Sequence, residues 1–133
     1  MQKNINFLIV DDVDTTRELL RGLIQSVLNN NNFKFQVNVF QAANAAQTKQ
    51  ALEKNNIHLA FLDIELPDGS GLELLRLIKS DYPDCKAVMV SGNASKENVL
   101  ASVEVGVLGF ILKPFNYLRV EEAIKNFVKK SLT

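Results

Sequence analysis

The chain has 133 residues, of which 15 are basic and 15 acidic, so its formal net charge at pH 7 is zero. This balance provides no general attraction to nucleic acid or to an anionic membrane, and no apolar run approaches the ~20 residues that a membrane helix needs. The length predicts one domain spanning residues 1–133. The single cysteine excludes an intramolecular disulfide, and the first apolar run is too short for a signal peptide, so we expect a cytoplasmic protein.

Short apolar runs alternate along the chain with segments whose apolar residues recur three or four positions apart. The runs predict strands, and the spaced segments predict helices. The predicted strands are NFLIV (6–10), QVNVF (36–40), HLAFL (58–62), KAVMV (86–90) and LGFIL (108–112). Regular alternation of strand and helix predicts a parallel sheet that is covered by helices on both faces.

The predicted helices carry start signals and apolar faces. Polar residues that can cap a helix precede four of them: Asn44, Ser70, Ser95 and Asn116. The apolar face of the first helix is marked by Leu19, Leu20, Leu23, Ile24, Val27 and Leu28. A weaker face of the fourth helix is marked by Val99 and Val103, and Gly106 is expected to end that helix.

Reactive side chains follow four of the five predicted strands. Asp11 and Asp12 come after the first strand, Asp63 after the third, Ser91 after the fourth and Lys113 after the fifth. The carboxyl ends of parallel strands meet at one edge, so we expect these groups to share a crevice. Three neighbouring carboxylates repel one another unless a cation such as Mg²⁺ binds them. A carboxylate can also act as a nucleophile and form an aspartyl phosphate.

The first of these clusters permits a second interpretation. Asp12-x-Asp14-x-Thr16 has the spacing of the D-x-D-x-T motif of haloacid-dehalogenase-type phosphatases, in which Asp12 would be the nucleophile. That family requires a further acidic motif after its lysine, but the acids after Lys113 lie inside a helical pattern. The phosphatase interpretation also gives Asp63 no role. If Asp63 is the nucleophile instead, Asp14 is expected to cap the first helix.

Four motifs carry a resemblance to a known family. In order and spacing, LIVDD (8–12), LDIELPDGSG (62–71), VMVSGNASKENV (88–99) and FILKPF (110–115) resemble the receiver domains of two-component response regulators, including the single-domain chemotaxis regulator. The resemblance implies a flavodoxin-like (βα)5 doubly wound fold with strand order 2-1-3-4-5. It also implies a phosphoacceptor switch rather than an enzyme with a separate substrate.

The resemblance further implies roles for individual residues. Asp63 would be the phosphorylated aspartate. Mg²⁺, with Mn²⁺ as the alternative ion, would be bound by Asp12, Asp63 and the backbone carbonyl of Glu65, while Asp11 would act through a metal-bound water. Lys113, which the family follows with a cis proline, would pair with the phosphoryl group.

The remaining implied roles concern switching and its rate. Ser91 and Phe110 would be the switch residues, and Glu65 and Asn93 would tune the lifetime of the phosphate. The switch would act on an output face formed by the fourth helix, the fifth strand and the fifth helix.

The resemblance also implies partners. The phosphate would come from a histidine kinase or a histidine phosphotransfer protein, because the single histidine, His58, begins the third predicted strand, away from the crevice. The target would be a downstream protein or a fused output domain, so the chain is expected to be a stand-alone regulator or the N-terminal part of a longer one. No nucleic acid contact is expected from this domain, and it would be a monomer or a phosphorylation-dependent dimer. A degenerate receiver used only for docking is the remaining alternative, and the complete set of acids, serine and lysine argues against it.

Overall fold

Five parallel strands form the central sheet of the computed structural model, which describes residues 3–93 and 95–132. The strands are β1 (Lys3–Val10), β2 (Phe35–Ala42), β3 (Leu59–Asp63), β6 (Lys86–Ser91) and β7 (Gly109–Leu112). Their order is β2-β1-β3-β6-β7, which is the predicted order 2-1-3-4-5. All five predicted strands and the flavodoxin-like α/β fold are therefore confirmed.

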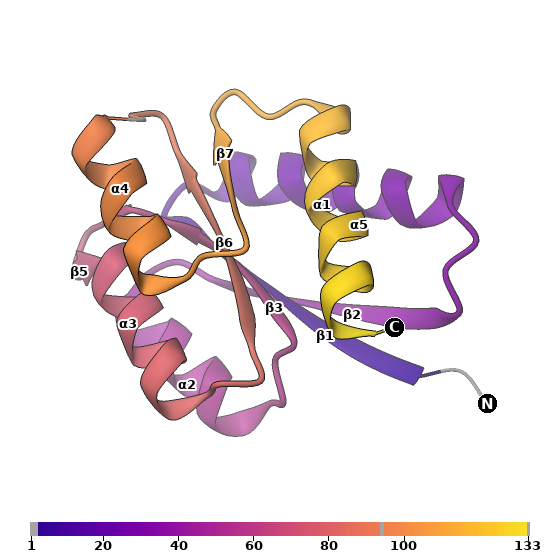
Figure 1. The fold of residues 1–133 in the computed structure, drawn as a ribbon, viewed down its shortest axis with the longest axis horizontal. Coiled ribbons are helices and arrows are strands. Elements are labelled where there is room, and N and C mark those ends of the chain that lie inside the picture. The colour runs from indigo at the N-terminus through magenta and orange to yellow at the C-terminus, as the bar shows by residue number, and fades with distance from the viewer. Residues whose placement is uncertain (1–2, 94, 133) are drawn as a thin grey trace.

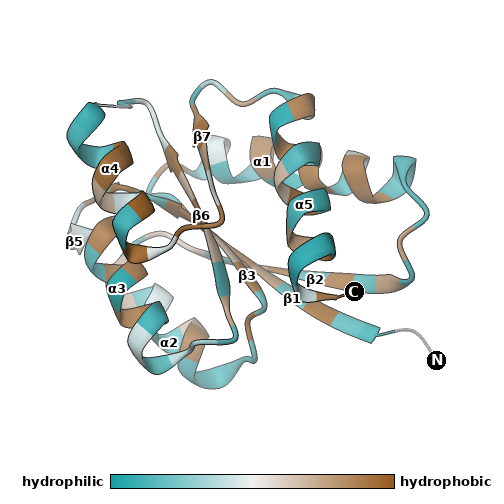
Figure 2. Ribbon diagram, viewed as in Figure 1, coloured by the Kyte–Doolittle hydropathy of each residue, from teal (hydrophilic) through white to brown (hydrophobic). Residues whose placement is uncertain are grey.

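Helices cover both faces of this sheet (Figure 1). One face packs against α1 (Asp14–Asn30) and α5 (Tyr117–Ser131), and the other packs against α2 (Ala45–Lys54), α3 (Gly71–Asp81) and α4 (Lys96–Val105). Every residue of β3 is buried, as expected for a central strand covered on both sides. Figure 2 shows both apolar and polar stretches along α1 and α5, and the buried apolar residues of these helices belong to one core cluster with those of the strands.

The core on the α1 and α5 face is built around three aromatic rings. Phe7 of β1 makes edge-to-face contacts with Phe61 of β3 and Phe127 of α5, with ring centroids 6.1 and 5.7 Å apart. All three side chains are fully buried. Edge-to-face pairs add to the hydrophobic gain of burial, so this contact fixes α5 against the middle of the sheet.

The four predicted N-caps are confirmed. Asn44, Ser95 and Asn116 each accept a hydrogen bond from the backbone N–H three residues further along, and Ser70 accepts one from Leu72. Gly106 ends α4 in the left-handed conformation, with φ of 99°. The expected capping role of Asp14 is wrong. Asp14 is the first residue of α1, and the N–H of the preceding Val13 donates to the carboxylate of Asp11.

Two predicted helix faces differ from the structure. Leu19 is 53% exposed, because the buried stripe of α1 runs through Leu20, Ile24 and Val27. On α4, Val103 is 62% exposed while the adjacent Ser102 is fully buried. The Ser102 hydroxyl can face the interior because it donates to the backbone carbonyl of Asn98, which satisfies the buried polar group.

A short hairpin that the sequence did not predict follows β3. Its strands are β4 (Glu65–Leu66) and β5 (Gly69–Ser70), paired antiparallel. At its turn, the Asp68 carboxylate accepts hydrogen bonds from the N–H groups of Ala45 and Ala46, at 2.7 and 3.1 Å. These bonds lower the pKa of Asp68 and attach the hairpin to the start of α2.

Two further expectations concern membranes and the cysteine. Among the described helices, none has the length and apolar character required to cross a membrane. Cys85 is buried just before β6, and burial raises the pKa of its thiol to about 12. A thiol with that pKa stays protonated at neutral pH, which is typical of a buried structural cysteine.

Candidate functional site

A cleft of about 480 Å³ lies at the carboxyl edge of the sheet, where β1, β3, β6 and β7 end. We call it the acidic cleft. Six of the predicted site residues line it: Asp12, Asp63, Glu65, Ser91, Asn93 and Lys113. The parallel sheet therefore brings together side chains that are up to 101 positions apart in the sequence, between Asp12 and Lys113.

Three carboxylates converge at this edge. Asp11, Asp12 and Asp63 each offer an oxygen, and the three oxygens lie within 4.8 Å of one another. The pairing of β1 with β3 explains the convergence, because Val10 is in register with Leu62, so the residues that follow the two strands are neighbours. Asp11 and Asp63 are 3% and 7% exposed, whereas Asp12 faces solvent. Hard oxygen ligands at this spacing, with one solvent-facing member, fit a divalent cation.

Lys113 is the counter-charge of the buried pair. Its ammonium Nζ lies 2.6 Å from Oδ2 of Asp11 and 3.1 Å from Oδ2 of Asp63. Its backbone N–H donates to the carbonyl of Ser91, which anchors the residue to the end of β6. The Lys113–Pro114 peptide bond is cis, as the resemblance implied. One ammonium thus contacts two of the three carboxylates, which leaves the cluster with a net negative charge.

The protonation equilibria reflect burial and this incomplete neutralisation. Burial raises the pKa of Asp63, and the nearby Asp11 carboxylate adds to the rise, while Lys113 opposes it. Burial would lower the pKa of Lys113, but its hydrogen bonds to Asp11 and Asp63 outweigh burial and raise it. Lys113 is therefore charged at neutral pH. Asp63 carries an unfavourable charge that a cation would stabilise.

Ser91 and Asn93 form the rim of the cleft after β6. The Ser91 hydroxyl, which is 2% exposed, accepts a hydrogen bond from the Asn93 N–H at 3.0 Å and donates to the Asn93 carbonyl at 3.2 Å. Both partners belong to the same short loop. A shift of that loop would therefore release the hydroxyl without breaking a contact to the rest of the fold.

Glu65 and Phe110 lie differently with respect to the cleft. Glu65 is exposed on β4, and its backbone N–H donates to Oδ1 of Asp63 at 3.3 Å. Phe110 is partly buried on β7 opposite Met89, where it packs against the core on the α3 and α4 side. Among the described residues that line the acidic cleft Phe110 is absent, and its strand β7 pairs with β6, which carries Ser91.

The second aspartate of the phosphatase motif, Asp14, lies outside the cluster. The side chain of Asp14 is 88% exposed and forms an ion pair with Arg17, three residues further along α1. The carboxylates that converge are Asp11, Asp12 and Asp63. The aspartate pair that the phosphatase interpretation requires is therefore not assembled, because the start of α1 turns Asp14 away from the cleft.

Arg17 supports the cleft and was not singled out from the sequence. Its Nη1 donates to the backbone carbonyl of Asp11 at 2.6 Å, and its Nε donates to Oε1 of Gln41 at 3.1 Å. The side chain is 12% exposed, and its third contact is the ion pair with Asp14. The spacing of Asp14 and Arg17 is visible in the sequence, but the contacts to Asp11 and Gln41 are not.

Gly71 is the second supporting residue that sequence reasoning missed. A Cβ atom at Gly71 would lie 2.1 Å from the backbone carbonyl oxygen of Asp63. The Gly71 N–H donates to the carbonyl of Ile64 at 2.7 Å. The start of α3 therefore approaches the end of β3 so closely that only glycine fits, and this contact holds the backbone of Asp63 in place.

Comparisons with known proteins agree with this site. A family model described as the response regulator receiver domain matches residues 7–125. The chain is similar to a response regulator receiver domain protein (CheY-like) from Methanospirillum hungatei JF-1, with 30% identity over 99% of this chain and 98% of that one, and a TM-score of 0.81. A response regulator from Thermotoga maritima shares 26% identity over 96% of this chain and 99% of that one, with a TM-score of 0.77.

A third similar structure is longer than this chain. The response regulator DrrB of Thermotoga maritima, an OmpR/PhoB homolog, is 24% identical, with a TM-score of 0.77 over 98% of this chain but only 54% of that one. At that identity the likeness shows the fold alone. The family match, the sheet order and the three converging carboxylates lead to one conclusion. The chain belongs to the response regulator receiver domains, the phosphoacceptor switches of two-component systems.

Proposed function

We propose that Asp63 is the residue that accepts the phosphoryl group, from a phosphohistidine on a histidine kinase or a histidine phosphotransfer protein. The observation that carries this proposal is the position of its carboxylate, which lines an open cleft, belongs to the acidic triad and contacts Lys113 at 3.1 Å. In the transfer, an Asp63 oxygen forms a bond to phosphorus as the phosphorus–nitrogen bond breaks. The bonding electron pair remains on the departing imidazole.

The cation proposed for the triad is Mg²⁺, with Mn²⁺ as the alternative. Asp12 and Asp63 would hold it directly with the backbone carbonyl of Glu65, and Asp11 would contact a bound water. The exposure of Asp12 beside two buried acids supports an ion that keeps several waters. When bound, the ion supplies positive charge that offsets the repulsion among the carboxylates and the phosphoryl oxygens.

Lys113 and Ser91 are proposed to recognise the phosphorylated state. Lys113 is proposed to turn from the carboxylate oxygens to a phosphoryl oxygen, which lies within reach because the ammonium already contacts Asp63. The Ser91 hydroxyl would exchange its contacts with Asn93 for a phosphoryl oxygen. The loop after β6 would follow, and Phe110 would turn inward, shifting the population of the face formed by α4, β7 and α5.

Glu65 and Asn93 are proposed to set the lifetime of the phosphate. Both side chains line the acidic cleft from opposite sides, Glu65 from β4 and Asn93 from the loop after β6. At these positions they would face an incoming donor or the water that hydrolyses the aspartyl phosphate.

The cellular setting is proposed on the same basis. Residues 1–133 would be one receiver domain in the cytoplasm, working alone or as the N-terminal part of a regulator, as a monomer or as a dimer formed on phosphorylation. The target would be a downstream protein or a fused output domain, and no nucleic acid would be bound by this domain itself.

The proposal is tested by phosphorylation with acetyl phosphate and Mg²⁺, followed by intact-mass measurement. One phosphoryl group should be gained by the parent protein and by Asp84→Asn, a control that removes an exposed acid far from the cleft. Asp63→Asn should gain none. Asp12→Ala should be modified slowly and still at Asp63, and EDTA should prevent the reaction, which Mn²⁺ should restore.

Two results would contradict the assignment. A phosphoryl group that survives Asp63→Asn would show another acceptor. Sustained hydrolysis of a phosphate monoester by the Asp63→Asn protein would revive the phosphatase interpretation, since the nucleophile would then be Asp12.

A further inference from the structure

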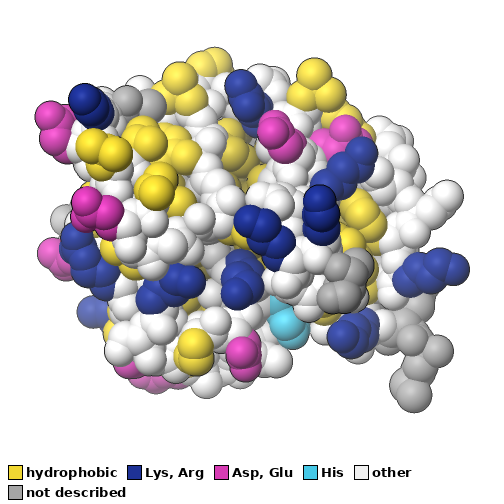
Figure 3. Space-filling model, viewed as in Figure 1, with side chains coloured by type: hydrophobic (Ala, Val, Ile, Leu, Met, Phe, Trp, Pro, Cys, Tyr) yellow, Lys and Arg dark blue, Asp and Glu magenta, His cyan; other side chains and the backbone are white. Residues whose placement is uncertain are grey.

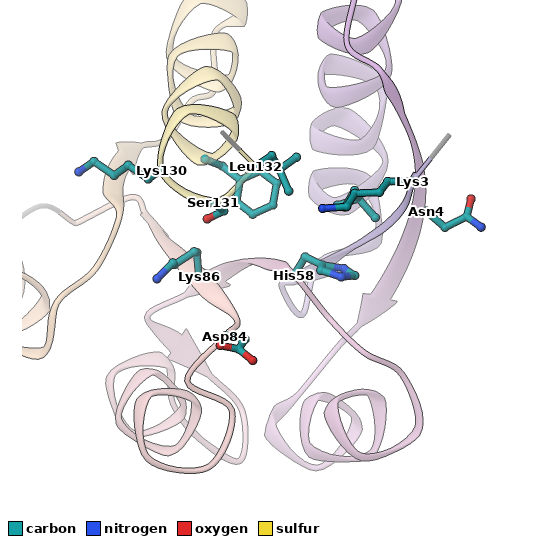
Figure 4. A pocket seen from close by; sticks show the side chains of 10 residues that line it. Lys3, Asn4, His58, Asp84, Lys86, Lys130, Ser131 and Leu132 are labelled. Atoms are coloured by element: carbon teal, nitrogen blue, oxygen red, sulfur yellow. The ribbon is translucent and has the colours of Figure 1, made fainter. Parts of the chain in front are cut away.

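A second cavity, of about 430 Å³, lies at the opposite edge of the sheet from the acidic cleft. It is formed where β1 and β6 begin, beside the residue that precedes β3 and the end of α5. Its titratable lining residues are Lys3, His58, Asp84, Lys86 and Lys130. We call it the lysine pocket. Figure 4 shows Lys3 extending above His58 from the β1 side, with Lys86 and Lys130 on the other side of the pocket and Asp84 below.

The charge of this pocket is not balanced by its own residues. Among the described residues that line it, three ammonium groups are accompanied by one carboxylate, Asp84. Within residues 3–93 and 95–132, neither Lys3 nor Lys86 nor Lys130 takes part in an ion pair. Figure 3 shows basic side chains on both sides of the single histidine. A chain with zero net charge has thus gathered a local excess of about two positive charges at this edge.

His58 adds no charge to this excess. Its Nδ1 accepts a hydrogen bond from the backbone N–H of Asn6 at 2.9 Å, which requires a ring nitrogen without a proton. Burial lowers the pKa of His58, and the charge of Lys3 lowers it further. His58 is therefore a neutral wall of the pocket, and the positive charge comes from the lysines.

The usual structural role of such lysines explains only one of them. Lys130 lies in the last turn of α5, where a cation stabilises the negative end of the helix dipole. Lys3 and Lys86 begin strands and have no such role. Both line the same cavity without an ion-pair partner among the described residues, so an anion in this cavity would be attracted by both ammonium groups.

The lining also fixes the chemical class of the anion. The side chains of Ile5 and Phe127, 2% and 1% exposed, form an apolar base, and the Ser131 hydroxyl adds a donor to the lining. The volume falls in the range of about 300–1,000 Å³ that is usual for small-molecule sites. We propose that the lysine pocket binds a phosphate monoester or diphosphate group, with Lys3 and Lys86 on its oxygens and the attached organic part against Ile5 and Phe127.

A phosphate group fits better than a single carboxylate for reasons of charge. A phosphate monoester carries about −1.5 to −2 charges at pH 7 with three strong acceptor oxygens, which matches the local excess. Lysine binds phosphate as a mobile point charge, so the exposed Lys3 can adjust its position around it. The group can belong to a free metabolite or to a lipid headgroup, and the two sources are distinguished by experiment.

The test uses titrations in EDTA, so that no cation attracts phosphate to the acidic cleft. Pyrophosphate and phenyl phosphate represent free ligands, and phosphatidylcholine vesicles with and without phosphatidic acid represent a headgroup. Amide chemical shifts of residues 3–5, 58 and 130–132 report the site. The double variant Lys3→Gln/Lys86→Gln should weaken phosphate binding about ten-fold, and Asp84→Asn should strengthen it about three-fold.

A matched control removes the same number of charges elsewhere. Lys49→Gln/Lys125→Gln changes one exposed lysine on α2 and one on α5 that do not line the pocket, and should leave the affinity within about two-fold of the parent value. Equal weakening in both double variants would overturn the proposal, as would chemical shift changes outside the pocket alone. Binding to the free probes identifies a metabolite as the source, whereas binding only to vesicles that contain phosphatidic acid identifies a headgroup.

Discussion

The two edges of the sheet carry opposite charges in opposite physical states. At the carboxyl edge, two acids and Lys113 are mostly buried and bonded to one another at 2.6 and 3.1 Å. At the amino edge, Lys3 and Lys130 are exposed, and together with Lys86 they form no ion pair within the described residues. The zero net charge of the chain therefore conceals an acidic pole and a basic pole on the same strands.

This difference teaches where a charge matters to the fold. A buried charge has lost its hydration and depends on its partner, so removal of the partner is costly. An exposed charge keeps its hydration, so its removal changes the field around the protein more than its stability. The same substitution should therefore have different effects at the two edges.

The largest effect is expected from Lys113→Met compared with Lys86→Met. Methionine keeps most of the volume and removes the charge. Lys113→Met leaves Asp11 and Asp63 buried without a counter-charge and should lower the free energy of unfolding by about 3 kcal/mol. Lys86→Met should change it by less than about 0.5 kcal/mol. Urea unfolding in EDTA at pH 7 measures both, and equal losses would remove the distinction between the edges.

The pH dependence of this difference has a defined sign. The pKa of Lys113 is raised above 10.5, so its stabilising contribution is complete at neutral pH and is lost as the pH rises through that raised value. The difference in free energy of unfolding between the parent protein and Lys113→Met should therefore become smaller above about pH 10.5. The same difference in free energy of unfolding should also become smaller at acidic pH. Burial raises the pKa of Asp63, and without Lys113 this carboxyl takes up a proton more readily, which removes the uncompensated charge.

The next effect concerns glycines at the two edges. Gly71→Ala places a methyl group 2.1 Å from the carbonyl oxygen of Asp63, so the backbone of β3 or α3 must move. We expect a loss of about 2–3 kcal/mol in the free energy of unfolding and slower phosphorylation by acetyl phosphate. At Gly109, where β7 begins, no atom lies within 4 Å of the added group, and Ala should stabilise by about 0.5 kcal/mol. Normal phosphorylation of Gly71→Ala would show that this close approach does not position Asp63.

Much of the fold could be predicted because its signals are local. Each strand is a compact apolar run, and Asn44, Ser95 and Asn116 cap helices through bonds that span three residues. The phase of α4 could not be predicted from its valines, because the buried position is taken by Ser102, whose hydroxyl is satisfied within its own helix. The β4–β5 hairpin has two residues in each strand, too few to show a period.

The site divides in the same way. Asp11, Asp63 and Lys113 could be found because each lies at the carboxyl end of a strand, and a parallel sheet collects such residues at one edge. The residues that support them could not be found from the sequence. Gly71 matters through its distance from the Asp63 carbonyl, and Arg17 matters through contacts that depend on how α1 lies beside the ends of β1 and β2.

The smallest effect is expected from Arg17→Met compared with Arg21→Met, one turn further along α1. Arg17 donates to the carbonyl of Asp11 and to Gln41, whereas Arg21 is exposed and forms an ion pair with Glu18 at 3.8 Å. Arg17→Met should lower the free energy of unfolding by about 1 kcal/mol. Arg21→Met should change it by less than about 0.5 kcal/mol.

If the role of Arg17 is purely structural, Arg17→Met should lower the stability and have no further effect. If Arg17 positions the backbone of Asp11, then Arg17→Met should also weaken Mg²⁺ binding about three-fold, measured as the increase of melting temperature with Mg²⁺ concentration. Arg17→Lys should restore little of the Mg²⁺ affinity, because lysine cannot donate in two directions from one planar group. Unchanged Mg²⁺ affinity in Arg17→Met would show that the acidic edge is organised by Lys113 and the strand ends alone, since the hydrogen bond at Asp11 would then hold α1 in place without shaping the triad.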